Sequence, residues 1–93
     1  MARDEIINAV EKETGSSIEA IKEERGDKRH ITMDLLYRIG GLKGREIGDI
    51  FDIDYSTVSV SRKRLRNKIQ KDRDLKRLLS RIEAKLSMIK IDP

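Results

Sequence analysis

The chain has 93 residues, of which 37% are hydrophobic and 41% are charged, and its net charge is +4. This length supports one small domain with a modest core, residues 1–93, and no apolar run approaches the roughly 18 residues that a membrane-spanning helix needs. With no cysteine and charged residues directly after Met1, we expect no disulfide framework, no thiolate metal site and no signal peptide, as in a cytoplasmic protein.

The first predicted helix covers residues 3–14, where the apolar residues recur on one side. It is expected to end at Gly15, because glycine readily adopts the left-handed conformation that closes helices. A shorter helix follows. Ser16 and Glu19 are predicted to form its capping box, and its pattern fades near Gly26.

A third helix is predicted to begin at Asp27, whose carboxylate can act as the N-cap. Its apolar residues repeat every four positions, at Ile31, Leu35 and Ile39. Gly40 and Gly41 then break the pattern. No alternating strand pattern is present in the first forty residues.

Residues 41–66 are predicted to form two helices joined by a tight turn. The first helix is predicted to place four apolar side chains on its core-facing side: Leu42, Ile47, Ile50 and Phe51. The turn falls at Asp52 and Ile53, and Asp54 is a favourable N-cap for the second helix. This pattern indicates a helix-turn-helix whose second helix lies against DNA.

The second helix of the pair begins with small hydroxyl residues and then becomes basic. A recognition helix enters the major groove by its N-terminal end, so short polar side chains suit base edges while Lys and Arg suit phosphates. The predicted base-facing residues are Tyr55, Ser56, Thr57 and Ser59. The basic residues that follow are Arg62, Lys63, Arg64, Arg66, Lys68 and Lys71, of which Arg62, Lys63 and Arg66 are the predicted phosphate contacts. The alternative is a solvated basic helix of an unrelated bundle.

A last amphipathic helix is predicted within residues 72–93. Its apolar seam consists of Leu75, Leu79, Ile82, Leu86 and Ile89, at alternating steps of four and three residues. Such a narrow seam suits either packing back on the domain, which a small core needs, or pairing with a second copy as a homodimer. The whole chain is therefore predicted to be an all-α bundle of about six helices.

Charge is distributed unevenly along this bundle. Residues 1–24 carry three basic and seven acidic side chains, residues 25–51 six and four, and residues 52–93 twelve and six, which gives −4, +2 and +6. A polarised field of this kind steers a domain onto nucleic acid. An anionic membrane fits less well, because the apolar stripes lack the Trp and Phe residues usual in interfacial helices.

The run from Arg29 to Arg66 resembles the DNA-binding domain of the bacterial replication initiator DnaA. Residues 46–51, Glu-Ile-Gly-Asp-Ile-Phe, and residues 54–58, Asp-Tyr-Ser-Thr-Val, are similar to that family's E-I-G-x-x-F and D-H-[ST]-T-V. The second half, with Lys71-Asp72-Arg73-Asp74-Leu75 and the leucine-rich helix, resembles the DnaA-like domain appended to some REP-associated tyrosine transposases. The resemblance covers about two thirds of the chain.

The resemblance implies double-stranded DNA as the partner, with bases read by Asp54, Tyr55, Ser56 and Thr57, and backbone contacts near Lys43 and Arg45. It also implies an arginine that enters the minor groove from the loop before the third helix, for which the candidates are Arg25, Lys28 and Arg29. A capped turn with surface charges is the other interpretation of that loop. Tyr55 stands where the family has His, so recognition of DNA is expected to transfer but the target sequence is not.

We expect no catalytic residue, metal or cofactor. Tyrosine transposases need a pair of metal-binding histidines and a nucleophilic tyrosine, whereas this chain has the single His30, which is expected to be structural. Tyr37 is expected to lie in the core, and no Walker-type Gly-Lys-Ser/Thr sequence is present. The alternative function is a helical protein–protein interaction module in which the basic helix and leucine stripe bind a partner protein.

Overall fold

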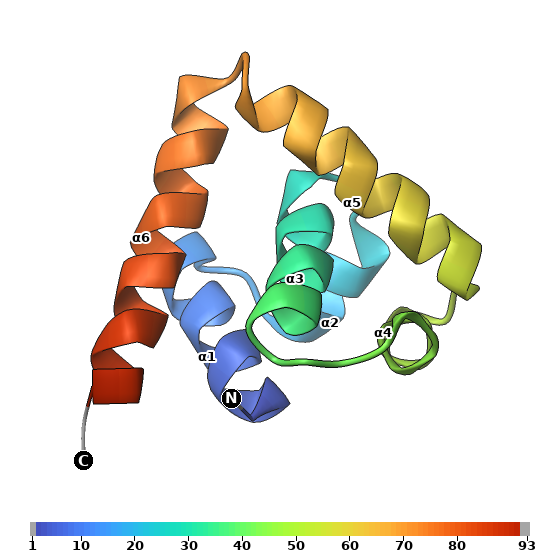
Figure 1. Ribbon diagram of the computed structural model, residues 1–93, viewed down its shortest axis with the longest axis horizontal. Helices are drawn as coiled ribbons and strands as arrows, with labels where there is room; N and C mark the ends of the chain where they lie inside the picture. Colours follow the sequence, from blue (N-terminus) through green and yellow to red (C-terminus); the bar gives the residue numbers. More distant parts are fainter. Residues whose placement is uncertain (1, 92–93) are drawn as a thin grey trace.

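A computed structural model describes residues 2–91, with the side chains of residues 2–88. This part of the chain folds into helices joined by short connections (Figure 1): α1 (Arg3–Thr14), α2 (Ile18–Glu23), α3 (Asp27–Arg38), α4 (Gly44–Phe51), α5 (Tyr55–Ile69) and α6 (Arg73–Ile91). The all-α class and the six predicted helices are confirmed. No described helix combines the length and apolar character needed to cross a membrane.

Helix α3 is the centre of the bundle, with α1, α4 and α5 packed around it (Figure 1). Residues 31–36 are all buried, including the polar Thr32 and Asp34, because neighbours cover this helix on several sides. A helix that is enclosed in this way needs more than one apolar stripe. Its surroundings therefore explain why Met33 and Leu36 are buried besides the predicted Ile31 and Leu35.

The end of α1 is as predicted, but the starts of α2 and α3 are shifted by one residue. Gly15 follows α1 with a φ of 71°. The N-cap of α2 is Ser17, whose hydroxyl accepts from the Ala20 N–H at 3.2 Å. The prediction of Ser16 as the cap is wrong, because its hydroxyl accepts instead from the Lys28 ammonium at 2.9 Å.

The predicted cap of α3 is also wrong, because Gly26 is the N-cap and Asp27 is the first helical residue. The Asp27 carboxylate makes no capping hydrogen bond. It pairs with the Lys68 ammonium on α5 at 2.9 Å. Its charge still lies in the first turn of α3, where a carboxylate is favourable to the helix dipole.

Helix α6 lies alongside α1, and the seam is part of the core (Figure 1). Its described members are at most 6% exposed: Leu75, Leu79, Ile82 and Leu86. The side chain of Ile89 lies outside the described residues. Ion pairs of Lys85 with Glu13 and of Glu83 with Arg38, both at 3.1 Å, join α6 to α1 and α3. The packing alternative therefore holds, and a dimer through this seam would require α6 to leave α1.

Candidate nucleic-acid interface

Helices α4 and α5 are joined by a tight turn at the predicted position. Asp52 ends α4 with a φ of 57°, and the Ile53 N–H donates to the Gly48 carbonyl at 2.9 Å. Gly48 is needed here, because a Cβ at this position would clash with the backbone carbonyl oxygen of Ile53. Gly48 therefore lets the backbone of the turn approach α4 closely.

Asp54 is the N-cap of α5, as predicted. Its Oδ1 accepts from the Thr57 N–H and the Thr57 hydroxyl, both at 2.8 Å, and from the Ser56 hydroxyl at 2.9 Å. Hydrogen bonds from Thr57 and Ser56 favour the ionised carboxylate and lower the pKa of Asp54. The three polar side chains at the start of α5 therefore form one local network, in which both hydroxyl protons are directed toward Asp54.

The N-terminal face of α5 is open to solvent. The side chains predicted to face bases are all exposed: Tyr55, Ser56, Thr57 and Ser59. Val60, for which the sequence predicted no role, is 48% exposed on the same helix. The spacing of four residues from Ser56 could have placed Val60 on this face from the sequence alone, since residues four apart share a helix face.

The start of α4 lies beside the start of α5. A Cβ at Gly44 would be 3.4 Å from the Cβ of Tyr55. The neighbours of Gly44, Lys43 and Arg45, are exposed and their side chains have no partner in the described structure. The Lys43 N–H donates to the Glu46 carboxylate at 3.0 Å, which holds the backbone of this corner. The structure thus places the backbone of two predicted cations, Lys43 and Arg45, beside the start of α5.

The basic residues of α5 do not share one environment. Lys63 and Arg66 are exposed and unpaired within the described residues, as is Arg64, which was not among the selected residues. The side chain of Arg62 is only 16% exposed, and its Nε donates to the Asp34 carboxylate at 3.2 Å. The prediction of Arg62 as a free phosphate contact therefore does not fit this structure.

Arg62 belongs to a buried polar network between α3 and α5. Its guanidinium lies 3.7 Å from the ring centroid of Tyr37. Asp34, which is 3% exposed, also accepts from the Arg38 Nε at 2.6 Å. Tyr37 is 46% exposed and is not the core residue that was predicted. Its ring is a platform on which the Arg62 guanidinium stacks.

The three cations proposed for the minor groove have different surroundings. Arg29 is 8% exposed, with its guanidinium 5.8 Å from the ring centroid of Phe51 and its Nε without a hydrogen-bond partner. The Lys28 ammonium donates a hydrogen bond to the Ser16 hydroxyl. Of these three cations, only Arg25 is exposed and unpaired within the described residues.

His30 is half-buried at the start of α3. Burial lowers its pKa, and the nearby charges of Arg29, Arg64 and Lys68 lower it further, against the opposing effect of Asp27. The structural role predicted for this histidine fits these surroundings. Across the described residues, no group of three or more His, Cys, Asp or Glu side chains could hold a metal ion.

Comparisons of this chain with protein-family models, with curated proteins and with solved structures gave no match. The interface is therefore defined by its own geometry. Its central feature is an exposed helix that presents hydroxyls at its N-terminal end and unpaired cations along the next two turns.

Proposed function

We propose that the protein binds double-stranded DNA sequence-specifically through a helix-turn-helix formed by α4 and α5, and that it has no catalytic activity of its own. The observation that carries this proposal is the exposed face of α5, where hydroxyl side chains precede Lys63, Arg64 and Arg66. This order suits a helix whose N-terminal end reads bases while its later turns contact phosphates. The resemblance to DnaA-type domains supports the same role, in a transposase-related or initiator-like protein of the cytoplasm.

The network around Asp54 supports a specific kind of base contact. The hydroxyl protons of Ser56 and Thr57 are directed toward the Asp54 carboxylate. Each hydroxyl oxygen then faces outward as an acceptor. In the major groove the exocyclic amino groups of adenine and cytosine are the donors. We therefore propose that this end of α5 prefers adenine or cytosine, with Val60 available to contact a thymine methyl group.

Phosphate contacts are assigned to the cations that keep their charge unpaired. Lys63, Arg64 and Arg66 lie along α5, and Lys43 and Arg45 lie beside its start. Phosphate neutralisation by such side chains releases counterions, which gives affinity that falls steeply with salt. Arg62 is excluded from this group because Asp34 and Tyr37 already hold its guanidinium.

The protein-interaction alternative is weakened by the position of the leucine stripe. Leu75, Leu79, Ile82 and Leu86 are buried inside the bundle and offer no surface to a partner protein. What is left for that alternative is the basic surface of α5 with the exposed Tyr55 and Val60.

Selection of bound duplexes from a random pool, followed by titrations over a range of salt concentrations, tests the proposal. Lys63→Ala and Arg66→Ala are each expected to flatten the salt slope by about one unit per lost phosphate contact, equally for all duplexes. Lys12→Ala is the matched control, because Lys12 is an exposed and unpaired cation on α1. Slopes for the α5 variants that equal the control slope would refute the phosphate assignment.

The base contacts are tested on the selected duplex and on duplexes with single base changes. Ser56→Ala is expected to reduce discrimination at one position by about 1–3 kcal/mol while leaving the salt slope unchanged. Arg62→Ala is expected to lower thermal stability and to leave the salt slope of the folded protein unchanged. A selected site without adenine or cytosine at the position that Ser56→Ala relaxes would contradict the acceptor assignment.

A further inference from the structure

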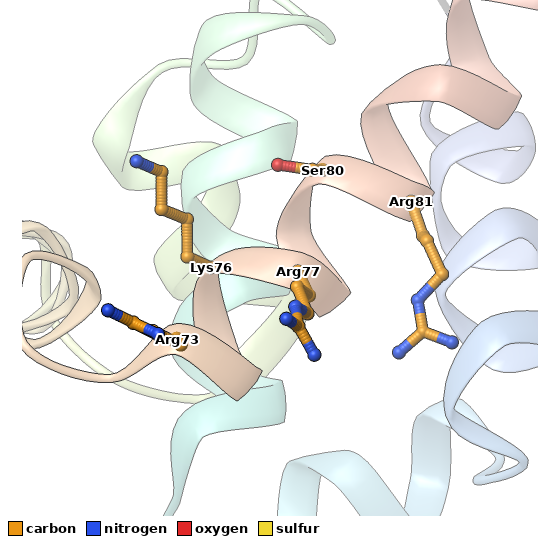
Figure 2. Close-up of a pocket in the computed structure, with 5 residues that line it drawn as sticks. All are labelled: Arg73, Lys76, Arg77, Ser80 and Arg81. Carbon is orange, nitrogen blue, oxygen red and sulfur yellow. The ribbon is translucent and has the colours of Figure 1, made fainter.

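The outer face of α6 carries a cationic strip that the proposed α5 interface does not use. We define the α6 strip as Arg73, Lys76, Arg77, Ser80 and Arg81, which line a shallow surface depression (Figure 2). All five residues are exposed. None of the four cations forms an ion pair or hydrogen bond within the described structure.

The strip follows from the periodicity of α6. The seam residues face the core, so the positions between them face solvent. Arg73, Arg77 and Arg81 are four residues apart, which places successive arginines about 6 Å apart along the helix axis. Three arginines at this spacing suit the oxygens of successive phosphates, because arginine binds phosphate through paired N–H groups.

Two carboxylates near the strip are engaged elsewhere, and Asp74, which follows Arg73, forms no ion pair with the strip in the described structure. Glu83, one turn further along α6, pairs with Arg38 on α3, and Glu13 pairs with Lys85. The strip also contains no aromatic or large apolar side chain. A protein partner would need such anchors, and so would a face that inserts into a membrane. The side-chain chemistry therefore favours a polyphosphate backbone.

The direction of the strip separates it from α5. From the turn at residues 70–72 the two helices diverge, with α5 covering α3 and α4 while α6 covers α1 (Figure 1). The outer face of each helix points away from the helices beneath it, so the two outer faces point in different directions. A straight duplex that lies along α5 therefore does not reach the middle of the α6 strip.

We propose that the α6 strip binds the phosphate backbone of a second segment of double-stranded DNA, so that one protein molecule bridges two segments. This inference rests on the proposed function for the first segment. Its contacts are to phosphates alone, so it is independent of base sequence. It predicts that bridging is more sensitive to salt than the binding of a single short duplex, because both sets of phosphate contacts release counterions.

The test uses a short duplex fixed to beads, a labelled second duplex, and the full chain as the bridge. Arg77→Gln/Arg81→Gln is expected to reduce captured labelled duplex at least about tenfold and to flatten the salt slope of capture by about two units. Single-duplex binding in solution should change less than about twofold. The matched control is Lys12→Gln/Lys22→Gln, which removes the same charge from exposed, unpaired lysines on α1 and α2. Circular dichroism checks that each variant keeps its helices.

The outcomes separate the two proposals. If Lys63→Ala weakens single-duplex binding but capture is absent, or is equal in the strip variant and its control, bridging is refuted and the α5 interface stands. If single-duplex binding depends on Arg77 and Arg81 and not on Lys63, the α5 interface is refuted and the bridging proposal with it. If the strip binds vesicles of anionic lipid or an acidic polypeptide in preference to DNA, its assignment to DNA is overturned.

Discussion

The buried carboxylate of Asp34 is the residue whose loss should reveal how α5 is held. It is 3% exposed and accepts from Arg38 at 2.6 Å and from Arg62 at 3.2 Å. Asp34→Asn keeps the shape and one acceptor oxygen but removes the negative charge. The Arg62 guanidinium then stays largely buried against the Tyr37 ring without a counter-charge.

Breaking a buried ion pair by removing one partner costs about 3–5 kcal/mol. The lower end applies here, because the Arg38 side chain is 32% exposed and keeps Glu83 as a second partner. A loss of about 3 kcal/mol corresponds to a fall in melting temperature of about 12–24 °C for a domain of this size. Since small domains are stable by about 5–15 kcal/mol, the variant should fold but melt early.

Urea and thermal unfolding of Asp34→Asn, Arg62→Met and the double variant measure this contribution. We expect the double variant to lose less stability than the sum of the losses of the two single variants, because Met at position 62 removes the buried positive charge that Asp34→Asn leaves without a partner. Asp49→Asn is the matched control, since Asp49 is an exposed carboxylate of α4 with no partner in the described part of the chain. If Asp34→Asn unfolds at the same urea concentration as this control, or if the losses are additive, Asp34 does not hold α5 in the way described.

Three other substitutions have clear expected effects. Gly48→Ala should destabilise the fold by about 1–3 kcal/mol in urea unfolding, because the added methyl meets the Ile53 carbonyl, which cannot rotate away. Asp54→Ala should lower the melting temperature by removing the acceptor for the Thr57 N–H. Because the folded pKa of Asp54 is lowered, its advantage over the variant should be complete above the ordinary value of 3.8 and decline as pH falls through the lowered pKa. The lowered pKa of His30 means that the folded state favours the neutral ring, so the protein should lose stability as pH falls below 6.5, and His30→Gln should not show this loss.

Each of these expectations has a matched comparison. Gly44→Ala is the control for Gly48, because a Cβ there makes only a 3.4 Å contact; equal stability of the two variants would contradict the clash. Asp49→Ala controls for loss of an exposed carboxylate, and an equal fall in melting temperature would remove the capping role of Asp54. For His30 the decisive range is about pH 5 to 8, where histidine titrates and most carboxylates do not. Parallel pH profiles of the variant and the parent protein would rule out the burial effect.

Elements that depend on neighbouring residues were predictable from the sequence. Gly15, the turn at Asp52 and the cap at Asp54 lie where they were expected, since each is decided by a few consecutive residues. The N-cap of α2 was not predictable in this way, because Ser16 and Ser17 are equally suited to it. Ser16 instead accepts from the ammonium of Lys28, which lies twelve residues further along the chain, and Ser17 caps the helix.

The candidate interface was predicted less completely for the same reason. Arg62 and Lys63 are adjacent and chemically alike, so the sequence alone does not tell which of them is free. The rotation of α5 on α3 decides which of the two cations is free, because it directs Arg62 to Asp34 and leaves Lys63 in solvent. Arg29 is a similar case, since its burial beside Phe51 depends on how α3 meets α4. The sequence shows which residues are charged, and the tertiary packing determines which of these charges are available to bind a partner.

The pairing of α1 with α6 has a consequence for how the molecule folds. It joins the two ends of the described chain, whereas α3, α4 and α5 are consecutive and contact one another. Contacts between distant segments carry a larger loop-closure entropy and tend to form after local ones. We therefore expect α6 to dock last and to open first, with faster amide hydrogen exchange than α3. Transient detachment of the chain ends would then leave the α4–α5 pair assembled on α3.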